Sequence, residues 1–146
     1  MFDLHGKKAL VTGSTQGIGL AIAKLFREAG AEVWIHGATS KEKCIAAARE
    51  AGCDKYVVKN LAEPDAAEVI YAATGDLDIL VLNASVQYRT PWDEITREAL
   101  ESQITINFSS SLSLIQAYMP HMKEQKYGRI LTVGSVQQYR PHKDMA

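Results

Sequence analysis

Three glycines inside the stretch TGSTQGIG, at positions 12–19, constrain the fold of this chain more than any other feature. The residues before them, 8–12 (KALVT), form a short apolar run that is typical of a buried strand. After them, apolar residues recur at helical spacing from Ile18 to Ala29, and Gly30 stands where a left-handed residue commonly follows a helix. Strand, tight turn and helix in this order predict the first unit of an α/β fold.

The same alternation of short apolar runs and helical patterns continues along the chain. We expect strands at 32–36, 55–59, 77–82 and 128–133, and helices at 41–51, 65–73 and 96–123, the last capped by Thr96. Apolar strands that are separated by helices pair in parallel and are buried on both faces. The pattern therefore predicts a doubly wound, Rossmann-like parallel sheet of about five strands. The last strand would lie at an exposed edge.

The composition is that of an ordinary globular domain and argues against several classes of partner. The chain has 146 residues, of which 47% are hydrophobic and 23% charged, and this predicts one domain over 1–146. A formal net charge of -1 without basic clusters argues against nucleic acid as a partner. No apolar stretch reaches the ~20 residues of a membrane helix, and the start lacks the apolar region of a signal peptide. We expect a cytoplasmic protein with no membrane partner.

The cysteines and histidines show no pattern of a metal or redox site. Cys44 and Cys53 do not form a C-x-x-C pair, and we interpret both as reduced and structural. The histidines are scattered without the spacing of metal ligands, so we expect no metal and assign packing or surface roles to His5, His36, His121 and His142.

The spacing of the glycines suits a bound pyrophosphate. Gly13 allows a tight exit from the strand, Gly17 lets the backbone approach a phosphate, and Gly19 lets the helix pack closely on the sheet. The unpaired N–H groups and the dipole of the helix N-terminus favour an anion there. No Gly-Lys-Ser/Thr closes the turn, which excludes a P-loop ATPase. We predict that a dinucleotide contacts Gly13, Ser14, Thr15, Gln16, Gly17, Ile18 and Gly19; the alternative is a turn that serves chain geometry alone.

TGSTQGIG at this place resembles the cofactor fingerprint of the short-chain dehydrogenase/reductase family, and further landmarks follow in the family's order over the whole chain. Asn60-Leu61 resembles the pair that contacts adenine, and 82–85 (LNAS) resembles Asn-Asn-Ala-Gly. Asn107 and Ser135 stand where the family places its catalytic Asn and Ser. The resemblance implies an NAD(P)-dependent oxidoreductase that interconverts a secondary alcohol and a ketone by hydride transfer.

The resemblance also implies the roles of these residues. Ser135 would hydrogen-bond the substrate oxygen, and Asn107 would hold a water that relays protons, beside a catalytic Tyr and Lys. The family's Tyr follows the Ser by about a dozen residues, beyond Ala146. We therefore expect the C-terminal part of the family fold to be missing, the domain to be incomplete, and the chain to be inactive by itself. Tyr139 and Lys143 have the Tyr-x-x-x-Lys spacing but enclose Pro141, and we interpret Tyr139 as a loop or pocket-wall residue.

Two departures from the family pattern affect the loop after the fourth strand. Leu82 replaces an Asn whose amide braces the sheet in the family, and Ser85 places a Cβ where Gly is usual. Asn83, Ala84 and Ser85 still provide a backbone path beside the ribose.

The sequence also bears on the choice between NAD and NADP and on the partners of the chain. NAD-specific folds usually carry an acid at about the position of Gly37, and its absence, together with the hydroxyls and Lys41 that follow Ala38, favours NADP over NAD. The partner would be a small carbonyl or alcohol substrate. Tyr88 and Trp92 would contact it, with packing in the core as the alternative for Trp92. We expect a homo-oligomer, dimer or tetramer; the run 109–113 fits a subunit contact or, by preference, a buried helix face. The alternatives are a non-catalytic dinucleotide-binding module and a protein that binds no nucleotide.

Overall fold

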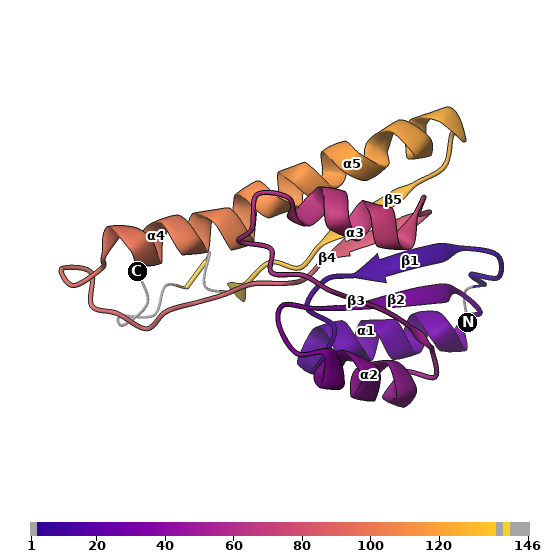
Figure 1. Ribbon diagram of the computed structural model, residues 1–146, viewed down its shortest axis with the longest axis horizontal. Coiled ribbons are helices and arrows are strands. Elements are labelled where there is room, and N and C mark those ends of the chain that lie inside the picture. Colours follow the sequence, from indigo (N-terminus) through magenta and orange to yellow (C-terminus); the bar gives the residue numbers. More distant parts are fainter. Residues whose placement is uncertain (1–2, 137–138, 141–146) are drawn as a thin grey trace.

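The five strands of the computed structural model, which describes residues 3–136 and 139–140, form one parallel sheet in the order β3-β2-β1-β4-β5. This arrangement confirms the Rossmann-like architecture (Figure 1). Strand order reverses beside β1, and ligands of open α/β sheets bind at such a switch point. The strands are β1 Lys8–Val11, β2 Glu32–Gly37, β3 Lys55–Val58, β4 Ile79–Leu82 and β5 Arg129–Thr132.

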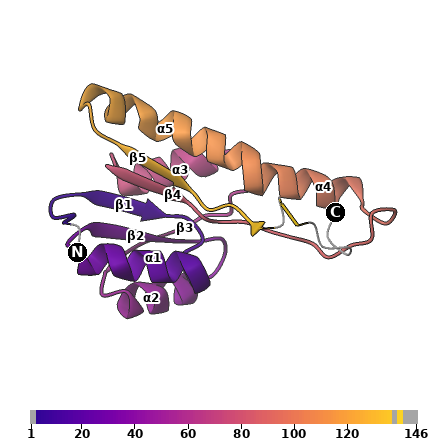
Figure 2. The ribbon, with the colours of Figure 1, turned by 180° about the vertical axis from the view of Figure 1, so that it is seen from behind.

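Helices cover both faces of the sheet, as Figures 1 and 2 show from opposite sides. Helices α1 (Gly17–Glu28) and α2 (Lys41–Glu50) lie on one face, where they bury alternate strand residues such as Val33 and Ile35. Helices α3 (Ala66–Thr74) and α5 (Ser110–Glu124) lie on the other face over Leu10 and Leu80. Two apolar clusters therefore sandwich the sheet.

Between α3 and α5 the Thr74 and Tyr118 hydroxyls form a buried hydrogen bond of 2.6 Å. Burial raises the pKa of Tyr118 to about 12. This pair lies within the core and satisfies two polar groups that would otherwise be costly to bury.

The long helix expected over 96–123 consists of three segments: α4 (Arg97–Ile104), the π-helical turn η1 (Thr105–Ser109) and α5. Thr96 caps α4 as predicted, because its hydroxyl accepts the Ala99 N–H at 3.1 Å. The three segments form one continuous rod whose α4 end projects beyond the sheet (Figure 1). A π turn widens the helix by one residue, which changes the direction of the side chains that follow it.

Several side chains lie elsewhere than the sequence suggested. Trp92 is 80% exposed, so the core packing that stood as one of its two expected roles is wrong. Within 109–113 only Ser110 is buried and Leu112 is half exposed, so this run is not a buried helix face. As expected, β5 is an edge strand, with Leu131 partly exposed. Tyr139 is 80% exposed and its partner Lys143 lies outside the described residues. Among the described helices none has the length and apolarity to cross a membrane.

Candidate active site

The glycine turn after β1 has a backbone that only glycine permits at three places. Gly13 and Gly17 have positive φ angles of 63° and 59°. A Cβ on Gly13 would lie 2.8 Å from the Ala84 Cα, and one on Gly19 would lie 2.5 Å from the Asn83 amide nitrogen. Around Gly17, in contrast, no atom lies within 4 Å of a Cβ position. Gly13 and Gly19 therefore permit close packing against the loop after β4, whereas Gly17 leaves open space above the start of α1.

The first turn of α1 carries no side-chain cap, since Gln16 at the N-cap makes no capping hydrogen bond. The helix N-terminus at Gly17 thus faces open space with N–H groups that a side chain has not satisfied. Such an end attracts an anion.

Thr12 joins the turn to the loop after β4. Its buried hydroxyl donates to the Val81 carbonyl at 3.2 Å and accepts the N–H groups of Asn83 at 2.9 Å and Ala84 at 3.0 Å. The Asn83 amide donates back to the Thr12 carbonyl at 2.9 Å and the Gly13 carbonyl at 3.2 Å. The two loops at the switch point are therefore fixed to each other.

Ser14 and His36 fix the other side of the turn. The Ser14 hydroxyl is fully buried, donates to the Val11 carbonyl at 2.7 Å and accepts the His36 N–H at 3.0 Å. The His36 imidazole accepts the Gly13 N–H, and burial lowers the pKa of this histidine. Sequence reasoning did not assign a site role to Thr12 or His36, because a single polar residue at a strand end has no diagnostic spacing.

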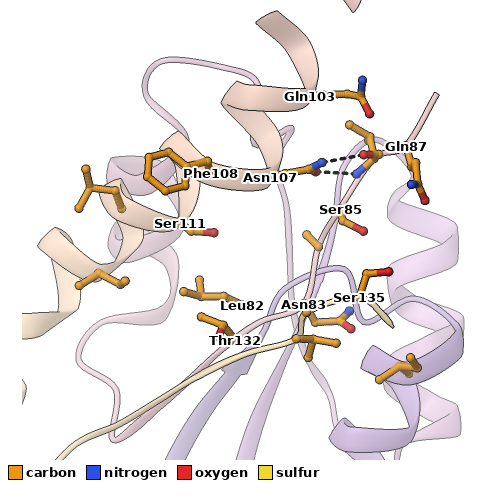
Figure 3. Close-up of a pocket in the computed structure, with 17 residues that line it drawn as sticks. Leu82, Asn83, Ser85, Gln87, Gln103, Asn107, Phe108, Ser111, Thr132 and Ser135 are labelled. Carbon is orange, nitrogen blue, oxygen red and sulfur yellow. Dashed lines mark hydrogen bonds between the residues drawn. The ribbon is translucent and has the colours of Figure 1, made fainter. Parts of the chain in front are cut away.

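Asn107 lies on η1 and pairs with the loop after β4. Its Nδ2 donates to the Val86 carbonyl and its Oδ1 accepts the Val86 N–H, both at 2.8 Å (Figure 3). Tyr88 strengthens the same contact, because its hydroxyl lies 3.2 Å from the Ser102 hydroxyl on α4. The π turn therefore carries the side-chain amide that pairs with this backbone segment.

Two cavities adjoin along this loop. The turn-side cavity, of about 670 Å³, is lined by the glycine turn, the end of β2, the loop after β3 and residues 83–86. The helix-side cavity, of about 650 Å³, lies between residues 82–87, the rod of η1 and α5, and the end of β5. Ile18 and residues 83–86 line both. A long ligand could therefore pass from one cavity to the other across this shared wall.

The structure brings the candidate residues together in these cavities. All the residues that we predicted to contact a dinucleotide line the turn-side cavity except Ser14 and Gly19, which lie inside the turn. Asn107 and Ser135 both line the helix-side cavity, with Asn107 on its helix side and Ser135 on its β5 side (Figure 3). None of the described residues that line the helix-side cavity is charged or carries an imidazole, phenol or thiol.

The family model of short chain dehydrogenases matches residues 7–146 of this chain. The chain belongs to the short-chain dehydrogenase family. Among its relatives are a 3-oxoacyl-[acyl-carrier-protein] reductase of Rickettsia prowazekii, 33% identical over 93% of this chain and 56% of the relative. A D-beta-hydroxybutyrate dehydrogenase of Cupriavidus necator is 36% identical over 90% of this chain and 54% of the relative. The chain thus spans little more than half the length of these curated relatives.

Solved structures of the short-chain dehydrogenase family superpose closely. A 3-oxoacyl (acyl-carrier-protein) reductase from Agrobacterium tumefaciens with NADP bound has a TM-score of 0.91 and 33% identity, over 99% of this chain and 58% of that one. A gluconate 5-dehydrogenase from Burkholderia cenocepacia in complex with NADP and tartrate has a TM-score of 0.84 and 33% identity, over 99% and 60% respectively.

The two departures from the short-chain dehydrogenase pattern fit the structure without strain. Leu82 is buried and packs in the cluster with Leu10 and Leu114, so apolar packing stands where the family has an amide. Ser85 is exposed on the wall between the cavities and does not have a positive φ angle, so its Cβ is accommodated.

Proposed function

We propose that this chain forms the dinucleotide-binding part of an NAD(P)-dependent oxidoreductase that interconverts a secondary alcohol and a ketone. One observation carries the proposal: the uncapped N-terminus of α1 opens at Gly17 into a cavity of about 670 Å³. Binding of NADP by structural neighbours of the same family supports it. The resident dinucleotide would accept or supply the hydride.

The lining residues suit the successive parts of such a ligand. The open space at Gly17 and Ile18 suits the pyrophosphate, because a Cβ at Gly17 would occupy it. Gly37, Ala38, Asn60 and Leu61 would enclose the adenosine. In this proposal Asn83, Ala84 and Ser85 form the wall along which the nicotinamide half reaches the helix-side cavity.

We propose NADP as the preferred cofactor. A Cβ on Gly37 would lie 2.6 Å from the Cys44 sulfur and 2.8 Å from the Thr15 Cγ2. An acidic side chain at position 37 is therefore sterically excluded, and no carboxylate from this position can repel a 2′-phosphate. A dissociation constant for NAD+ equal to or below that for NADP+ would contradict this preference.

For catalysis we propose that Ser135 hydrogen-bonds the substrate oxygen and that Asn107 orders a water through the loop that it holds. The described lining of the helix-side cavity contains no side chain that exchanges protons near neutral pH. On this ground we propose that the described residues bind the cofactor but do not support turnover by themselves. The competing function, a non-catalytic dinucleotide-binding module, predicts the same binding. The two functions differ when the chain is joined to the C-terminal part of a family member, because only an enzyme then shows hydride transfer.

Cofactor binding is tested by titrating NADP+ into the chain and into two glycine variants. Gly17 and Gly52 both have positive φ angles, 59° and 71°, and both have open space at the Cβ position. Gly17→Ala places its methyl in the proposed pyrophosphate site, whereas Gly52→Ala imposes similar backbone strain elsewhere. We expect Gly17→Ala to weaken NADP+ binding at least ~10-fold. Equal affinities for both variants, or no binding by the unmodified chain, would refute the proposed site.

We also propose that the protein is a cytoplasmic homo-oligomer. Leu100, Ile104, Phe108 and Leu112 recur every fourth residue on the rod of α4, η1 and α5, and each is about half exposed or more. An apolar stripe of this kind favours contact with a second copy. The free thiols of Cys44 and Cys53 fit a reducing compartment. Sedimentation of the chain and of Phe108→Glu tests the first part, since a monomer in both would contradict it.

A further inference from the structure

We propose that His36 is a positioning residue for the dinucleotide site, because its imidazole holds the N–H of Gly13 and thereby fixes the first glycine of the turn. The inference rests on the proposed cofactor function. It assigns a role to a histidine that lies at the end of β2 and is 2% exposed.

The two ring nitrogens of His36 have different partners. The Gly13 N–H donates to Nδ1 at 3.1 Å, and Nε2 lies 2.9 Å from the Lys59 carbonyl oxygen. A backbone N–H can only donate and a carbonyl can only accept. The ring must therefore carry one proton, on Nε2, and donate it to Lys59. The two contacts select a single neutral tautomer and link the turn after β1 to the end of β3.

Gly13 is thus held at both of its backbone polar groups, the N–H and the carbonyl. His36 accepts its N–H, and the Asn83 amide donates to the Gly13 carbonyl at 3.2 Å. The backbone of His36 adds two hydrogen bonds to Ser14, one in each direction, both at 3.0 Å. Because the N–H of Gly13 donates to the imidazole, the N–H groups at the start of α1 are the ones that would bind the anion. The imidazole therefore acts on the ligand through the backbone of the turn.

Two polar side chains near His36, among the described residues, have other surroundings and do not replace it as acceptor of the Gly13 N–H. In the loop after β3 the Lys59 ammonium is paired with Glu63 and Asp65, and on α2 the Cys44 thiol lies against Gly37 with a pKa raised by burial. An apolar side chain at position 36 would leave the Gly13 N–H without its partner. The positive φ angle of Gly13 would then be less well maintained.

Three substitutions separate positioning from a general structural role. In His36→Asn the Oδ1 occupies the place of Nδ1 and still accepts from Gly13. In His36→Gln the side-chain amide reaches the place of Nε2 and donates to the Lys59 carbonyl, but it does not accept from Gly13. The leucine of His36→Leu makes neither hydrogen bond. Thr74→Val is the matched control, because it breaks a buried hydrogen bond far from both cavities.

The readouts are the dissociation constant for NADP+ by calorimetry and the midpoint of thermal unfolding for each variant. We expect His36→Asn to bind within ~3-fold of the unmodified chain, and His36→Gln and His36→Leu to bind ~10-fold more weakly or worse. Thr74→Val should lose stability and keep its affinity. Affinity that follows stability across all variants, or Gln rescuing better than Asn, would overturn the inference.

An NMR measurement on the unmodified chain keeps the inference testable if the variants do not fold. Long-range ¹H–¹⁵N correlations of the His36 ring should show one proton, on Nε2, with Nδ1 as an acceptor. A proton on Nδ1 would overturn the inference about His36 and leave the proposed function intact. Absence of NADP+ binding by the folded, unmodified chain would overturn the proposed function, and the inference with it.

Discussion

Replacing Thr12 by valine tests the joint between the two loops at the switch point. Valine has nearly the shape of threonine, and position 12 is 1% exposed, so the change removes a hydroxyl with little change in volume. The lost oxygen accepts two N–H groups, from Asn83 and Ala84, and donates one proton to Val81. The perturbation is therefore confined to three hydrogen bonds.

The expected cost follows from these partners. A partly buried donor that loses its acceptor costs about 1–3 kcal/mol, and two such donors remain in Thr12→Val. Because the donors are adjacent and only part-buried, we expect the lower part of the summed range, ~2–4 kcal/mol of unfolding free energy. A domain of about 150 residues loses roughly 2–4 °C in midpoint per kcal/mol. The midpoint should thus fall by roughly 4–16 °C.

Urea unfolding followed by the fluorescence of the chain's tryptophans measures this loss, with Thr12→Ser as the control. Serine keeps the oxygen and removes only a methyl group, so it should retain most of the stability and of the NADP+ affinity. Thr12→Val should lose both, since the loops that it separates line the turn-side cavity. A loss below ~0.5 kcal/mol in Thr12→Val, or an equal loss in Thr12→Ser, would refute the reasoning.

Three further predictions concern other parts of the site. Gly37→Ala should destabilise the chain by ~1–3 kcal/mol, because its Cβ would lie 2.6 Å from the Cys44 sulfur. The double variant with Cys44→Ala should recover part of this loss, which urea unfolding measures. Asn107→Leu should remove both hydrogen bonds to Val86 and speed the exchange of the Val86 amide proton by roughly tenfold, which hydrogen-exchange NMR measures against Gln103→Leu. Burial depresses the pKa of His36 below its usual 6.5, so the folded chain binds fewer protons there than the unfolded chain. The free energy of unfolding should therefore fall as the pH drops below 6.5. Unfolding curves at pH 5–8 measure this dependence, and His36→Asn should remove the contribution of this group.

Local patterns were enough to predict the parallel sheet and the glycine turn. The run 8–12 is continuously apolar, and the residues after the turn repeat at helical spacing. The pattern changes at Gly13, so neighbouring residues alone predict the strand, the turn and the helix. The same holds for the Thr96 cap, whose acceptor and donor are three residues apart. The glycine turn and this cap each depend on a few adjacent residues, and the structure confirms both.

The features that sequence reasoning missed depend on residues far apart in the chain. His36 meets Gly13 and Lys59, each 23 residues away, and neither pairing has a recurrent spacing. The π turn at Thr105–Ser109 likewise carries Asn107, whose partner Val86 lies 21 residues away, and helix propensity did not predict it. Core packing, one of the two roles considered for Trp92, is wrong because hydrophobicity alone does not say which large side chain is covered.

The position of β1 between β2 and β4 has a consequence for the order in which the chain folds. The β1–α1–β2 unit closes over a shorter stretch of chain, whereas the hydrogen bonds that Asn83 donates to Thr12 join residues 71 apart. Long loops close later because more chain entropy must be lost before a contact forms. A nascent chain that has built only its first two strands holds the glycine turn but not the wall opposite it. Affinity for a dinucleotide should therefore arise late in folding. A bound ligand would then stabilise the contact between the glycine turn and the loop after β4.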